Sequence, residues 1–318
     1  MSQKILVVLG ATGKQGGSVI KSILADPKAK SLFKLRAITR DTTKESAKAL
    51  ESQGVETVSA DLGNKESLIK AFQGAYAVFS VTDYWSTMDT NVEYSQGKAA
   101  ADAAKETGVQ HFVWSSLLNT TKSTNGKLSN IEHFDTKAAV EEYIRSIDLP
   151  ASFYLPGFYM SNIPGQALRK DDSTGKYVFQ LPIQSDAKIP VIDIENDTGK
   201  FVKSILLNRD ATIGKHIYGA SAYLSPQDIV DGFVKAFSKD GQGASFKIQD
   251  DNEYKGVLAY FGMPEKVQVE LLENMHLLNP EFGYYAGADL TESHSILTDE
   301  LTSWSDYVKA SPAFKDLQ

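Results

Sequence analysis

A glycine-rich stretch near the N-terminus constrains the fold of this chain more than any other feature. An apolar run at residues 5–9 leads into Gly-Ala-Thr-Gly-Lys-Gln-Gly-Gly at residues 10–17, and a helix-like stretch follows at 18–25. Glycines in a strand-to-helix turn let backbone N–H groups approach a pyrophosphate with no Cβ in the way, and the helix N-terminus adds partial positive charge. The pattern therefore predicts a dinucleotide site. A plain turn in another α/β protein is the alternative that the motif alone leaves open.

Strand-like and helix-like stretches alternate regularly after this turn. Strands are expected at residues 35–40, 55–60, 76–81, 111–115 and 151–155, with helices between them. Such alternation is typical of an α/β protein with a Rossmann-type, doubly wound parallel sheet.

The alternation becomes irregular from about residue 157, where Pro164, Pro182 and Pro190 interrupt short segments. We therefore expect a dinucleotide-binding domain at residues 1–156 and a smaller mixed α/β region at residues 157–318. The second region is expected to pack on the first without a linker and to contain a further strand at 216–219.

Composition excludes several classes of function. The 318-residue chain has a formal net charge of −7 and no cysteine. Nucleic-acid and membrane-surface partners need basic patches, which this acidic balance argues against, and no stretch is long and apolar enough to span a membrane. Thiolate chemistry and Cys-rich zinc sites are impossible, and the five histidines lack the spacing of metal ligands. We expect a cytoplasmic protein without a metal.

The end of the second strand indicates which dinucleotide is bound. An acid there accepts hydrogen bonds from the adenosine ribose of NAD(H), whereas a cation compensates the 2′-phosphate of NADP(H). This strand ends at Arg40, with Lys44 one turn further on and Lys14 in the glycine turn, which favours NADP(H). Asp41 is the counter-argument, because a shift of one residue would put an acid in the reading position.

Further motifs carry a resemblance to a known family. Besides the turn at residues 10–19, they are Thr39-Arg40 and the segments 74–79, 82–85, 96–98, 133–137 and 155–156. Together they resemble the NmrA-like family, an atypical branch of the short-chain dehydrogenases, and most closely its NADPH-sensing, HSCARG-type members. The resemblance covers the chain to about residue 165 and the remainder more loosely. Ser95 departs from the sensor-type pattern, which has a lysine there.

The resemblance implies a Rossmann fold, bound NADP(H) and a regulatory role. The implied function is a redox sensor that changes conformation or association with cofactor occupancy, through a protein partner or a second copy of the chain. The implied cofactor contacts are Gly10, Ala11, Thr12, Gly13, Lys14, Gln15, Gly16, Arg40, Lys44, Asp61, Leu62, Thr82, Asp83, Tyr84, Lys137, Pro156, Gly157, Phe158 and Tyr159.

The acid–base residues of the superfamily are incomplete in this chain. Short-chain dehydrogenases normally carry Tyr-x-x-x-Lys on one helix face, but here the pair is His133 and Lys137. His133 could relay a proton near neutral pH, or it could fix local structure while Lys137 binds the nicotinamide ribose. Leu117 stands where the extended branch has a hydroxyl, after Ser115 and Ser116. We therefore expect slow reduction of ketones.

An NADPH-dependent reductase of quinones or small carbonyl compounds is the alternative function, because a quinone accepts hydride without a strong acid. The aromatic residues Tyr84, Trp85, Phe158 and Tyr159 fit a small planar substrate in the cleft. Tyr254 is an alternative proton donor. A scaffold protein with a vestigial site is a third possibility, against which the glycines and Arg40 argue.

Overall fold

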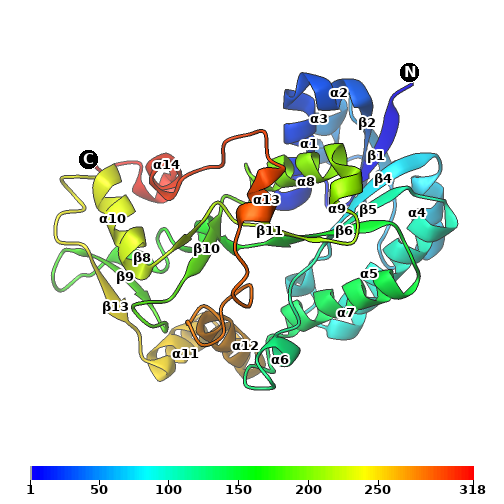
Figure 1. Cartoon of the computed structure of the whole chain (residues 1–318). Helices are drawn as coiled ribbons and strands as arrows, with labels where there is room; N and C mark the ends of the chain where they lie inside the picture. Colours follow the sequence, from blue (N-terminus) through cyan, green and yellow to red (C-terminus); the bar gives the residue numbers. More distant parts are fainter. Residues whose placement is uncertain (1) are drawn as a thin grey trace.

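A parallel sheet forms the centre of the computed structural model, which describes residues 2–318 (Figure 1). Within these residues the sheet has seven strands in the order β11-β6-β5-β4-β1-β2-β3. The strands are β1 (Lys4–Val8), β2 (Phe33–Thr39), β3 (Glu56–Ser59), β4 (Ala75–Ser80), β5 (His111–Ser115), β6 (Ala151–Pro156) and β11 (His216–Gly219). This arrangement confirms the predicted Rossmann-type fold.

Helices cover both faces of this sheet, so alternate residues of each strand enter different cores. In β1, Leu6 and Val8 pack with one layer of helices, whereas Val7 packs with the opposite layer. The first layer contains α1 (Lys14–Ala25) and α8 (Thr198–Leu207), and the second contains α4 (Lys65–Phe72), α5 (Thr90–Glu106) and α7 (Glu132–Ser146). Shorter helices are α2 (Pro27–Leu32), α3 (Glu45–Glu51), α6 (Thr120–Ser123) and α9 (Arg209–Thr212).

The strand order reverses between β1 and β4. The chain runs outward through β1, β2 and β3, and then returns to place β4 on the other side of β1. Open α/β sheets bind ligands at this switch point, outside the carboxyl ends of the strands. The glycine turn follows β1 and the segment 82–85 follows β4, so both predicted cofactor segments lie at this edge.

Residues after β6 form two small mixed sheets and a group of helices, on the left and at the bottom of Figure 1. These sheets have the orders β12-β10-β7 and β13-β9-β8. The elements are β7 (Phe158–Tyr159), β8 (Leu168–Lys170), β9 (Tyr177–Leu181), β10 (Ile189–Ile192), β12 (Ala222–Leu224), β13 (Ser245–Ile248), α10 (Pro226–Ala236), α11 (Asp251–Tyr260), α12 (Glu265–His276), α13 (Thr291–Ser295) and α14 (Trp304–Ala310), with 3-10 turns η2 (Met160–Asn162) and η3 (Pro312–Phe314). A further 3-10 turn, η1 (Tyr84–Ser86), belongs to the first half of the chain, between β4 and α5.

The second half of the chain also completes the main sheet. Strand β11 pairs in parallel with β6, and α8 packs beside α1 on one face of the sheet. The strand expected at 216–219 therefore exists, but its partner belongs to the first half. A helix of the length and apolar character needed to cross a membrane does not occur in residues 2–318.

Candidate functional site

The glycine turn leaves backbone N–H groups open at the start of α1. Gly10 has a φ of +61°, and the N–H of Gly13, the N-cap residue of α1, donates to the Gly10 carbonyl at 2.9 Å. A Cβ on Gly16 would lie 2.3 Å from that carbonyl oxygen, so only glycine allows the helix this close. No side chain caps α1 and its first turn holds no acid. The first turn can therefore receive an anion.

Gln15 links this turn to two other strand ends. Its Oε1 accepts a hydrogen bond from Ser115 at 2.8 Å, and its Nε2 donates to the Tyr159 hydroxyl at 3.1 Å. Ser115 ends β5 and Tyr159 lies in β7, so one buried amide links the glycine turn and the loop 156–159, both predicted to bind the cofactor, to the end of β5. The neighbouring Ser116 donates instead to Glu141 at 2.6 Å.

At the end of β2, the acid and the cations predicted to distinguish NAD(H) from NADP(H) have different surroundings. The Asp41 carboxylate accepts hydrogen bonds from the Thr43 N–H at 2.8 Å and the Thr43 hydroxyl at 2.6 Å. These two bonds, with Lys44 nearby, hold the pKa of Asp41 below its usual value. The Arg40 and Lys44 side chains are exposed. Asp41 is thus engaged in its own turn.

Three further residues predicted to contact the cofactor are Lys14, Asp61 and Leu62. The Lys14 ammonium lies 3.5 Å from the Ser161 hydroxyl and 3.8 Å from Glu195, so it contacts the second half of the chain. Asp61 accepts the N–H of Gly63 at 2.7 Å, and Leu62 packs half-buried against the core.

The Lys137 side chain is buried in an ion pair. Its ammonium contacts Glu93, which is 1% exposed, and lies 3.4 Å from the Thr82 hydroxyl. Thr82 also donates to Glu93 at 2.7 Å. The second carboxylate oxygen of Glu93 is buried and has no hydrogen-bond partner in residues 2–318. The sequence did not indicate Glu93 as a site residue, because an acid in the first turn of a helix is usually explained by its favourable interaction with the helix N-terminus.

His133 is paired with a carboxylate from a distant helix. Glu270 of α12 lies with Oε1 2.6 Å from His133 Nδ1, and the same oxygen accepts the backbone N–H of His133 at 2.9 Å. Its other oxygen accepts from the Tyr84 hydroxyl at 3.0 Å. Glu132 also lies 3.0 Å from that hydroxyl. Glu270 is 1% exposed, and nothing in its local sequence marks it as a site residue.

A cavity of about 710 Å³ lies beside this pair, over the carboxyl ends of β4, β5 and β6. His133 and Leu117 line it, together with the loop 156–159 that is predicted to touch the cofactor. The second half supplies most of the remaining wall, which is mainly apolar and includes Leu181, Tyr254, Val257, Leu258, Leu271, Met275 and Tyr284, and Phe134 of α7 adds to it from the first half. Polar side chains also line the cavity, namely Asn162, Gln166, Arg169, Gln180, Gln249 and Asn274. The volume and lining fit a small ligand that is largely apolar.

The aromatic residues predicted for the cleft divide between core and cavity. Trp85 lines the cavity, and its ring lies 4.8 Å from that of His133. Tyr84 is 1% exposed and does not line it. Tyr254 lines the cavity, and burial raises the pKa of its hydroxyl to about 12.

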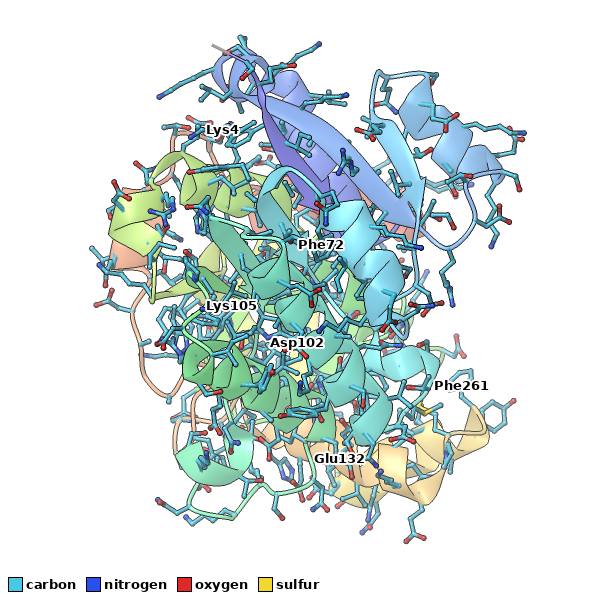
Figure 2. The ribbon with its side chains drawn as sticks, turned by 90° about the vertical axis from the view of Figure 1, so that its right-hand side faces the viewer. Lys4, Phe72, Asp102, Lys105, Glu132 and Phe261 are labelled. Carbon is cyan, nitrogen blue, oxygen red and sulfur yellow. The ribbon has the colours of Figure 1, made fainter. Side chains whose placement is uncertain are left out.

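Exposed apolar side chains stand at the rim of the cavity. Trp85 is 40% exposed on one side, and Phe261 and Met263, which are 72% and 36% exposed, follow α11 on the other. Figure 2 shows Phe261 projecting from the outer end of the α11–α12 helices. Among residues 2–318, no group of three or more acids and histidines could hold a metal ion.

The fold and the glycine turn place the chain among the Rossmann-fold proteins. More narrowly, it belongs to the NmrA-like family, whose sequence profile matches residues 1–308. The curated relative malD of Malbranchea aurantiaca, an NmrA-like family domain-containing oxidoreductase, is 35% identical over 248 residues, which are 73% of each chain. The match confirms the predicted family.

Solved structures show the same fold at low sequence identity. NmrA, a negative transcriptional regulator, in complex with NADP aligns with a TM-score of 0.79 at 20% identity, covering 99% of this chain and 97% of that one. NmrA has also been solved with NAD. The Citrobacter sp. triphenylmethane reductase complexed with NADP(H) aligns with a TM-score of 0.74 at 22% identity, covering 96% and 98%.

Proposed function

We propose that this protein is an NADP(H)-dependent oxidoreductase that reduces a small, largely apolar compound. The observation that carries the proposal is the shared loop at residues 156–159, which lines the cavity and is held to the glycine turn by the Gln15–Tyr159 hydrogen bond. A cofactor on the turn and a ligand in the cavity would therefore meet at this loop. Residues 1–156 would supply most of the cofactor side, and residues 157–318 most of the substrate side.

The residues at the turn fit NADP(H). The open first turn of α1 would receive the pyrophosphate, and the exposed Arg40 and Lys44 would face the 2′-phosphate, while Asp41 is held by Thr43. Lys137 would reach the nicotinamide ribose after leaving Glu93. When bound, the reduced cofactor supplies a hydride. Complexes of NmrA with NADP and of triphenylmethane reductase with NADP(H) support this choice.

Turnover and binding measured together test the proposal. The protein is titrated with NADPH and NADH by calorimetry, and NADPH absorbance is then followed with a panel of quinones, aldehydes and ketones. We expect tighter binding of NADPH and its oxidation with at least one acceptor. Tight binding of NADPH without its oxidation by any acceptor would contradict the proposed oxidoreductase activity. Equally tight binding of NADH would contradict the proposed preference for NADP(H).

A redox sensor is the second candidate function, and the Lys137–Glu93–Thr82 cluster favours it. If Lys137 binds a cofactor ribose, the cluster must open, and Tyr84 lies two residues after Thr82 in contact with Glu270 of α12. Binding of the cofactor would thereby change the conformation of α12, in the second half of the chain. Hydrogen exchange with and without NADPH tests this, and we expect changed protection in α12. Protection that changes only at the glycine turn would contradict a sensor.

A further inference from the structure

We infer that His133 and Glu270 form a proton-transfer pair, in which Glu270 positions the imidazole and His133 Nε2 exchanges a proton with a carbonyl or alcohol oxygen in the cavity. The inference rests on the proposed function and narrows it to substrates that need a proton at the site, namely aldehydes, ketones and the corresponding alcohols. The missing tyrosine alone predicts slow reduction of ketones. With His133 as the proton donor, we expect ketones to be reduced at an appreciable rate instead.

The imidazole is fixed in one orientation. Glu270 Oε1 holds both Nδ1 and the backbone N–H of His133, and the Trp85 ring lies against the imidazole at 4.8 Å. With Nδ1 bound to a carboxylate, Nε2 is the nitrogen left for the cavity that His133 lines. Carboxylates that hold a histidine in this way set its tautomer and orientation in acid–base sites.

The proposed reduction balances with the groups at hand. The hydride forms a bond to the carbonyl carbon, the C=O π pair moves to oxygen, and that oxygen takes the proton from Nε2 of the imidazolium. The products are an alcohol, the oxidised cofactor and a neutral imidazole that regains its proton from water. In the reverse direction, neutral His133 accepts the alcohol proton at Nε2.

Other candidate donors fit this role less well. Leu117 occupies the position expected for a hydroxyl and lines the cavity without a proton to give. Tyr254 lines the cavity too, but burial raises the pKa of its hydroxyl to about 12, and no cation acts to lower it. A phenol acts as an acid at neutral pH when a nearby cation lowers its pKa.

Charged groups around His133 determine the pH dependence. Burial lowers the pKa of the imidazole, Glu270 and Glu93 raise it, and Lys137 lowers it, with a net shift below the usual value. The Tyr84 hydroxyl and Glu132 also belong to the polar surroundings, and Lys266 of α12 pairs with Glu132 at 2.6 Å. Neutral imidazole therefore predominates at pH 7, so carbonyl reduction should accelerate as the pH falls through the His133 pKa and alcohol oxidation as it rises.

Nitrogen NMR of the histidine rings tests the pair without turnover, using His133→Gln to identify the His133 signals. We expect neutral His133 to carry its proton on Nδ1, and Glu270→Gln to lower its pKa while keeping an acceptor for the His133 N–H. Glu273→Gln is the matched control, because Glu273 lies on the same helix and accepts the Asn130 N–H at 2.8 Å. A proton on Nε2 of neutral His133, or a His133 pKa that is unchanged by Glu270→Gln, overturns the inference.

The pH profile of NADPH-dependent aldehyde and ketone reduction tests the proton transfer itself. We expect kcat/KM to fall above the His133 pKa, and the falling limb to move to lower pH in Glu270→Gln but not in Glu273→Gln. His133→Gln should lower carbonyl reduction by about 10²–10⁴-fold. Full carbonyl reduction by His133→Gln overturns the inference alone. NADPH binding without turnover of any acceptor overturns the proposed function and the proton transfer with it, even if the NMR result is as expected.

Discussion

Arg40 and Asp41 are adjacent in sequence but differ in their contacts. Asp41 is bound to Thr43, whereas Arg40 is exposed at the end of β2. We therefore expect Arg40→Ala to weaken NADP(H) binding by about 1.5–3 kcal/mol, because a charge-assisted hydrogen bond to the phosphate is lost. Calorimetric titration measures this, with Asp41→Asn as the control that should leave NADP(H) affinity nearly unchanged. Tighter binding of NAD(H) that Asp41→Asn abolishes would make Asp41 the reading residue.

Glu93 belongs to a buried ion pair, so its replacement should affect stability and cofactor binding in opposite directions. Glu93→Gln leaves the buried Lys137 ammonium without a counter-charge, and breaking such a pair costs about 3–5 kcal/mol. The same change frees Lys137, so NADP(H) should bind more tightly. Denaturant unfolding with and without NADPH measures both effects.

Glu106→Gln is the matched control on α5, because its pair with Lys65 is exposed and should contribute much less to stability than the buried pair. Equal losses of stability in the two variants would show that the buried pair has no special role.

The start of α1 is where one element determines both folding and binding. A Cβ at Gly13 would lie 3.3 Å from the Gly10 carbonyl oxygen. A Cβ at Gly16 would lie only 2.3 Å from the same oxygen and would clash with the backbone. Gly13→Val should therefore fold and lose NADP(H), because its side chain fills the path of the pyrophosphate. Gly16→Val should lose stability by about 1–3 kcal/mol or more through overpacking. Thermal unfolding and cofactor titration separate the two, and intact binding by folded Gly13→Val would reject the dinucleotide site.

Elements with a local signal were predictable from the sequence. The glycine turn, the strands of the main sheet and the one-turn spacing of His133 and Lys137 all follow from residues close in the chain. Glu93 and Glu270 were not predictable, because their partners Lys137 and His133 lie 44 and 137 residues away. The strands of the small sheets are two to five residues long, so their periodicity is too short to distinguish them from loops.

At the scale of the whole molecule, the division of the chain at residue 156 was predicted from local patterns, which do not show the contacts between the two halves. A strand pattern at 216–219 indicates a strand but not its partner, and the structure pairs it with β6. Helix α8 likewise brings Phe201, Val202 and Ile205 into the core shared with α1 and the sheet. The cofactor side therefore depends on residues from both halves of the chain.

A chain that ends at residue 156 should consequently fail to fold by itself. It would lack β11, which leaves an open edge on β6, and α8, which uncovers apolar side chains of α1 and the sheet. We expect the full chain to unfold in one cooperative transition followed by circular dichroism, and the 1–156 fragment to show no such transition and to bind ANS. A cooperative transition and NADPH binding by the fragment would show instead that residues 1–156 are an independent domain, and that β11 and α8 only extend it.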